Sequence, residues 1–138
     1  MQFKDVIGQA KLKEKLIHGV RKNKISHAQL FLGDPGYGSL GLAMAFAQYV
    51  LCENKTAEDS CGHCPSCRKI NELQHPDLHF SFPTVQSISK TSNPFYEDWR
   101  GQLKETSYFS LFDWIKKIDS KERKPIISVD ESLDIQTK

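Results

Sequence analysis

The spacing of apolar residues along the first fifty positions changes from a helical repeat to a strand-like run and back. Residues 9–23 carry one apolar stripe of a helix, formed by Leu12, Leu16, Ile17 and Val20. Residues 28–32 are mostly apolar and stop at Gly33, which is typical of a buried central strand. Residues 39–51 return to helical spacing. This order predicts an α/β arrangement.

The second half of the chain gives further element signals. Polar and apolar residues alternate over residues 77–82, which predicts another strand. Ser110 precedes a stripe that includes Trp114 and Ile118, so it is expected to cap a helix. Ser128 and Glu131 have the spacing of a capping box, in which the glutamate side chain reaches back to the serine backbone.

All four cysteines fall in one module, Cys52-x8-Cys61-x2-Cys64-x2-Cys67. Two-residue gaps let thiolates converge on one ion, and a fourth thiolate arriving over a longer loop completes a tetrahedron around zinc. Four protein ligands leave no open position for water, so the predicted role of zinc is structural. His63 is an alternative ligand, although four thiols make a loop role the simpler interpretation.

Two disulfides are the competing interpretation of these cysteines. The first residues are polar and do not resemble a signal peptide, which favours a reducing cytoplasm in which disulfides do not persist. No apolar run is long enough for a membrane span. We therefore expect a cytoplasmic protein with no membrane partner.

A glycine-rich segment joins the predicted strand to the helix at residues 39–51. Its residues are Gly33, Asp34, Pro35, Gly36, Tyr37, Gly38, Ser39 and Leu40. Strand, glycine turn and helix are the context of a phosphate-binding loop, Gly-x-x-x-x-Gly-Lys-Ser/Thr, and both glycines are present at the right spacing. Ser39 replaces the lysine and Leu40 replaces the hydroxyl residue that holds magnesium. We predict a degenerate loop without catalysis; a plain strand-to-helix turn is the alternative.

Composition changes this picture little. Of 138 residues, 38% are hydrophobic and 26% charged, which is ordinary for a soluble globular protein. The formal charge of +2 falls to about zero once four thiolates hold one zinc ion. Net charge therefore does not point to nucleic acid, although residues 11–24 form a local basic segment.

Several of these motifs occur together in one family. Residues 7–9, the run from Ser26 to Gly33, the glycine loop, the cysteine module and His75-Pro76-Asp77 resemble bacterial DNA polymerase III clamp-loader subunits. The likeness covers residues 3 to 82 and resumes weakly at residues 127–130. It implies the N-terminal portion of a P-loop AAA+ domain, a parallel sheet flanked by helices, with the zinc module at residues 52–67 as an insertion.

The family contains ATP-hydrolysing gamma and tau subunits and a delta-prime subunit with an eroded loop. Ser39 and Leu40 place this chain beside delta-prime. The resemblance implies a non-hydrolysing part of the DNA replication machinery that binds zinc but is not expected to hold nucleotide. Its implied partners are the gamma/tau and delta subunits and, through the assembled complex, the sliding clamp and primer-template DNA. An active gamma/tau-like ATPase and a zinc-stabilised DNA-binding module are the alternative functions.

Residues 83–124 depart from the family and are interpreted as an aromatic-rich insertion. Its rings could stack on bases, but a small satellite core or a subunit contact is the simpler interpretation. The resemblance further implies that residues 1–138 stop before the acidic Walker B strand and the lid domain. Arg68, Arg100 and Arg123 do not match the family's arginine motif, and none is assigned as an arginine finger.

Overall fold

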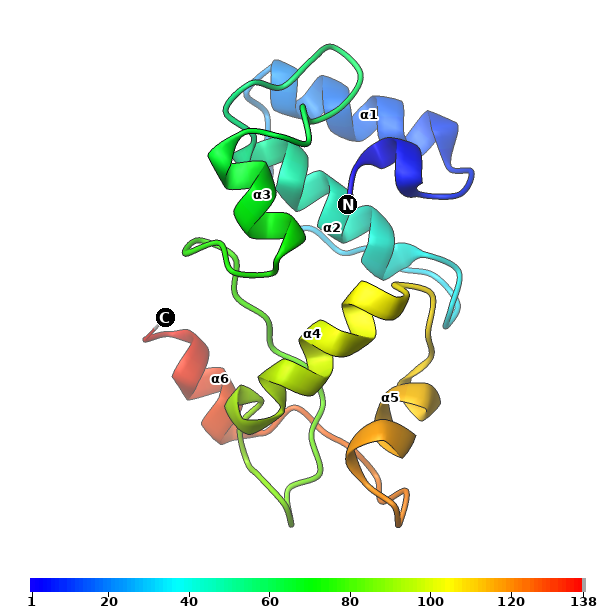
Figure 1. Cartoon of the computed structure of the whole chain (residues 1–138), viewed down its shortest axis with the longest axis vertical. Coiled ribbons are helices and arrows are strands. Elements are labelled where there is room, and N and C mark those ends of the chain that lie inside the picture. The colour runs from blue at the N-terminus through cyan, green and yellow to red at the C-terminus, as the bar shows by residue number, and fades with distance from the viewer. Residues whose placement is uncertain (138) are drawn as a thin grey trace. The chain divides into compact units, whose positions relative to one another are not determined.

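The computed structural model describes residues 1–137, and these residues divide into two compact units, residues 1–78 and residues 79–137. The first unit contains η1 (Phe3–Asp5), α1 (Ala10–Arg21), α2 (Ser39–Leu51) and α3 (Pro65–Asn71). The second contains η2 (Asn93–Phe95), α4 (Tyr96–Glu105), α5 (Leu111–Ile118) and α6 (Val129–Ile135) (Figure 1). None of the helices in this described part has the length and apolarity that crossing a membrane requires.

Helix α2 is the centre of the first unit. It starts where predicted because Gly38, at φ +89°, supplies the left-handed N-cap, and it packs beside α1 and α3. Its buried face joins Leu42, Ala45 and Tyr49 to Phe3 and Val6 of the N-terminal segment. Helix α1 matches the predicted stripe at residues 9–23, but none of its residues is fully buried. It therefore covers the core from the surface side.

The predicted strands do not form among the described residues. At residues 28–32 there is no neighbouring strand to supply a ladder, so the segment stays irregular although its composition suits a strand. At residues 77–82 the alternation instead serves packing, because Phe80 and Phe82 place their rings against Trp99. Within residues 1–137 the one β-bridge joins Thr84 and Ile126. The parallel sheet expected from the family resemblance is not seen here.

The core of the second unit is aromatic. Phe82 and Trp99 stack with ring centroids 4.3 Å apart, and Trp114 meets both of them edge-on at 5.1 and 5.0 Å. Trp114 is only 1% exposed, and its Nε1–H donates to the carbonyl of Pro83 at 2.8 Å. The polar group of this buried indole therefore has a hydrogen-bond partner. These buried rings therefore act as a packed core and do not offer their faces to bases.

Two helix caps close this unit. Ser110 caps α5 as predicted, and Asp113 adds the reciprocal bond of a capping box. Ser128 also caps α6, as predicted. The second bond of the predicted capping box, from the Ser128 N–H to the Glu131 carboxylate, is not formed, so that prediction is wrong. The buried Glu131 carboxylate instead accepts from the Ser92 N–H at 2.7 Å and from its hydroxyl at 2.6 Å. The Glu131 side chain thus bonds to a residue 39 positions away in the sequence and not to the backbone of its own helix cap.

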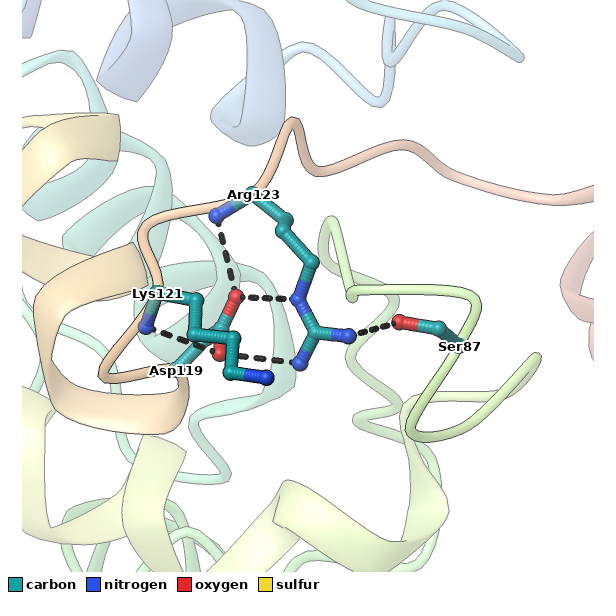
Figure 2. Close-up of polar contacts among 4 residues, drawn as sticks. All are labelled: Ser87, Asp119, Lys121 and Arg123. Carbon is teal, nitrogen blue, oxygen red and sulfur yellow. Dashed lines mark hydrogen bonds and ion pairs between the residues drawn. The ribbon is translucent and has the colours of Figure 1, made fainter.

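An ion pair holds the turn after α5 (Figure 2). The buried Asp119 carboxylate accepts from the Arg123 Nε at 3.0 Å and from the Lys121 backbone N–H at 3.1 Å. The guanidinium continues to the Ser87 hydroxyl at 2.5 Å. These contacts, led by the Arg123 side chain, hold the pKa of Asp119 well below its usual value. Arg123 therefore joins the turn after α5 to the loop at Ser87.

Candidate functional site

The four cysteines lie together at the junction of α2 and α3. Cys52 directly follows α2, and Cys64 is the N-cap of α3 with Pro65 as the first helical residue. Glu53 joins these two helix ends, because its Oε1 accepts from the Ser66 N–H at 3.1 Å and from the Ser66 hydroxyl at 2.7 Å. The helices thus deliver thiols that are distant in sequence to one point.

The sulfur positions fit one tetrahedral metal ion. All four Sγ atoms lie within 4.8 Å of one another, and all four thiols are free of disulfides. The Cys52–Cys61 separation is 3.6 Å, and the Cys52–Cys64 and Cys61–Cys67 separations are both 4.0 Å. Four sulfurs at about 2.3 Å from zinc would be about 3.8 Å apart. The predicted convergence is confirmed, and the cluster could bind a metal ion.

Backbone N–H groups point at the sulfurs. The N–H of Cys61 donates to Cys52, that of Cys64 to Cys61, and that of Cys67 to Cys64, at 3.3, 3.3 and 3.4 Å. Burial opposes charge on Cys64, but the N–H donors of Cys67 and Glu53 outweigh it and lower the pKa of this thiol to about 6. Burial is the main cause that raises the pKa of Cys67, to about 12, and it also raises the pKa of Cys52. A metal dication would replace the protons on these thiols.

His63 lies in the turn between Cys61 and Cys64 and is exposed. Its Nδ1 contacts the carbonyl oxygen of Cys61 at 2.8 Å, and it is absent from the group of candidate ligands. Gly62 has φ +78°, and a Cβ there would come within 2.9 Å of the Gln2 side chain. The turn thus needs glycine at this position and leaves His63 outside the sulfur cluster.

A second set of contacts, which the sequence did not signal, attaches the N-terminal segment to the cysteine loop. The Asp59 carboxylate accepts from the backbone N–H groups of Phe3 and Lys4, both at 3.0 Å. Gln48, which is fully buried in α2, donates to the Ser60 hydroxyl at 3.1 Å. The partners of Asp59 lie 55 and 56 positions away, so no local pattern could identify them.

The glycine-rich segment at residues 33–40 leads into the N-terminus of α2. Gly36 and Gly38 are both left-handed, at φ +81° and +89°, and the Tyr37 N–H closes a turn onto the Asp34 carbonyl at 3.1 Å. Ser39 is the first residue of α2 and Leu40 is half-buried. Residues 33–37, including Pro35, are exposed. No Lys or Arg lines the hollow beside this segment, as far as the described residues go.

The comparisons with known proteins agree with one another. A family model described as "DNA polymerase III, delta subunit" matches residues 8–109. The chain is 37% identical over 82 residues to the DNA polymerase III subunit delta' of Bacillus subtilis, covering 59% of this chain and 25% of that protein. It is 31% identical over 106 residues to the subunit tau/gamma of Haemophilus influenzae, covering 77% of this chain and 14% of that protein.

A further relative is the subunit delta' of Escherichia coli, 34% identical over 70 residues, which are 51% of this chain and 21% of that protein. The chain thus spans a quarter or less of the length of these relatives. No solved structure matches it. The family match covers most of the chain, and the cysteine cluster and glycine segment lie inside it. The chain therefore belongs to the family of DNA polymerase III clamp-loader subunits.

Proposed function

We propose that this chain is part of a clamp-loader subunit that resembles delta-prime: it is held together by a structural zinc ion and does not hydrolyse ATP. Its role in the assembled complex is passive support while other subunits, of the gamma/tau and delta kinds, load the sliding clamp on primed DNA. The observation that carries this proposal is the pair Ser39 and Leu40 at the start of α2.

The chemistry of the loop supports the absence of hydrolysis. A phosphate-binding loop needs a lysine to neutralise the outer phosphates and a hydroxyl to hold magnesium. The Leu40 side chain has neither group, and Ser39 carries no positive charge. Gly36 and Gly38 have left-handed conformations, which can turn backbone N–H groups towards an anion, and this supports the interpretation of the segment as a phosphate-binding loop that lacks its reactive side chains. Relatives of both the delta' and the tau/gamma kind match the chain. The proposal that it resembles delta-prime therefore rests on Ser39 and Leu40.

The arrangement of the four cysteines supports a structural zinc site. Three of the sulfur separations, from 3.6 to 4.0 Å, bracket the edge of a zinc–thiolate tetrahedron, and all four sulfurs lie within 4.8 Å of one another. Cys52, Cys64 and Cys67 are almost fully buried. Zinc would use all four thiolates, leaving no position for water, and would join the end of α2 to α3. A reducing cytoplasm is the compartment in which four free thiols remain available for the metal.

Nucleotide binding tests the proposal. A titration of the zinc-loaded chain with ATP and magnesium, followed by calorimetry, is expected to give no saturable binding up to about 1 mM. The double variant Ser39→Lys, Leu40→Thr should gain measurable affinity, because it restores the point charge and the metal ligand. Tight binding and steady ATP hydrolysis by the unmodified chain would refute the proposal and favour the gamma/tau-like alternative.

A further inference from the structure

The charge of the chain is unevenly distributed along the sequence. Residues 1–24 contain seven Lys and Arg and two Asp and Glu, so their net charge is +5, whereas the rest of the chain carries −3. Both values count histidine as neutral. The small overall charge of +2 therefore conceals a strongly cationic N-terminal segment, and most of its cations lie on helix α1.

The side of α1 that faces away from the core carries a row of lysines. Leu16, Ile17 and Val20 pack against the core of the first unit. Side chains three or four residues apart share one side of a helix, and one such row lies opposite this apolar stripe. The row, here called the lysine face, consists of Lys11, Lys15, His18 and Lys22. All four side chains are exposed on the first unit, so a ligand can reach them.

Stability of the chain does not explain the lysine face. As far as the structure describes it, no carboxylate forms an ion pair with Lys11, Lys15 or Lys22. Lys11 and Lys15 are four positions apart, a spacing at which like charges destabilise a helix. The first turn of α1 also lacks an acidic residue, although the helix dipole favours anions there. The cations are therefore placed at a cost to the helix, and this points to an anionic partner.

The make-up of the lysine face distinguishes between anionic partners. It contains no apolar residue, whereas a protein interface is anchored by buried aromatic or aliphatic side chains. An anionic membrane would need the apolar stripe of α1, which already packs against the core. Single strands stack on aromatic rings, and residues 10–22 contain no Phe, Tyr or Trp. A duplex backbone, in contrast, requires only a row of cations.

We propose that the lysine face of α1 binds the phosphate backbone of duplex DNA. Lys11 and Lys22 are about 16 Å apart along the helix axis, and a duplex presents about one phosphate charge per 1.7 Å of its own axis. Each lysine therefore meets a phosphate as a point charge, without reading the base sequence. Membership of the DNA polymerase III family favours DNA over other duplexes. The proposal does not depend on Ser39 and Leu40, so it can fail while the proposed lack of ATP hydrolysis stands.

The salt dependence of binding tests this proposal. A labelled duplex of about 20 base pairs is titrated with the zinc-loaded chain between about 50 and 200 mM salt, followed by fluorescence anisotropy. Three phosphate contacts predict a slope of about −2.7 for the logarithm of the association constant against the logarithm of salt concentration. The dissociation constant should be about 100 µM or tighter at about 50 mM salt.

Glutamine variants assign the contact to α1. The triple variant Lys11→Gln, Lys15→Gln, Lys22→Gln should weaken binding at least tenfold, and each lysine removed should reduce the slope by about 0.9. Glutamine is as good a helix former as lysine, so circular dichroism should show that the helix is retained. The matched control removes the same charge from exposed positions of the second unit and should change the affinity less than twofold; it is Lys116→Gln, Lys121→Gln, Lys124→Gln.

Lysine acetylation of the unmodified chain, read by mass spectrometry, gives a second measurement that does not depend on any variant folding. The duplex should protect Lys11, Lys15 and Lys22 from the reagent and leave Lys121 reactive. Absence of binding at about 50 mM salt would overturn the proposal, and so would binding that the triple variant leaves unchanged. Tighter binding to a single strand of the same length, to poly-glutamate or to phosphatidylserine vesicles would also overturn it, because the face would then serve another polyanion.

Discussion

Replacing Cys64 by serine separates two roles of one side chain. The Cys64 Sγ is a candidate metal ligand, and it also accepts the Cys67 N–H at 3.4 Å as the N-cap of α3. Serine is a good N-cap but a poor zinc ligand. Cys64→Ser should therefore preserve the start of α3 while removing one of four thiolates, so that the loss measured is the loss of metal binding.

The expected loss of stability can be worked out because zinc binding stabilises the folded state. Zinc at a thousandfold excess over its dissociation constant stabilises the folded state by about 4 kcal/mol. Loss of an outer-shell partner already weakens metal sites about 10- to 100-fold, and loss of a direct ligand should cost more. We therefore expect Cys64→Ser to lower the free energy of unfolding of the first unit by about 2 to 4 kcal/mol with zinc present. Since small domains are stable by only about 5–15 kcal/mol, this change is large.

The assay combines metal analysis with urea unfolding, followed by circular dichroism. The unmodified chain should carry one zinc per chain, and a chelator should lower its unfolding midpoint to near that of Cys64→Ser. His63→Ala is the matched control, because His63 lies in the same turn, is exposed and is not among the candidate ligands. It should keep its zinc and lose less than about 0.5 kcal/mol. Full zinc occupancy in Cys64→Ser, or a midpoint unaffected by the chelator, would refute the reasoning.

Three further predictions concern the second unit. Glu131→Ala should cost about 2–3 kcal/mol in urea unfolding, because it leaves the two buried donors of Ser92 without an acceptor, whereas Asp130→Ala at the exposed neighbouring position should cost under about 0.5 kcal/mol. Trp114→Ala should cost about 3–5 kcal/mol and abolish the near-ultraviolet signal of the packed indoles, since Trp114 is 1% exposed; unchanged stability would show that this core is not cooperative. The lowered pKa of Asp119 stabilises the fold above the unfolded value of about 3.9, and this contribution is lost as pH falls towards the folded value. Asp119→Asn should therefore flatten the pH dependence of unfolding between about pH 2 and 4, and an unchanged slope would contradict the ion pair shown in Figure 2.

Features with short-range causes could be predicted from the sequence. Helix α2 starts at Ser39 because Gly38 adopts the left-handed cap and an apolar repeat follows at once. The convergence of Cys61, Cys64 and Cys67 follows from two-residue gaps, and the turn between them keeps all three sulfurs close. The cap at Ser110 likewise needs only the next three residues. In each case the determining contacts lie within one or two turns of chain.

Contacts across long separations decided the rest. Residues 28–32 have strand composition, but a ladder needs a partner that the described residues do not provide. Glu131 has the spacing of a capping box, yet its carboxylate accepts from the N–H and the hydroxyl of Ser92, two buried donors that would otherwise have no acceptor. The attachment of Phe3 to Asp59 leaves no periodic trace at all. Local chain geometry thus determined helices α1, α2, α5 and α6 and the close approach of Cys61, Cys64 and Cys67. Helix α4, which the sequence did not predict, and the pairing of distant groups were decided only by the tertiary structure, through packing and the need to satisfy buried polar atoms.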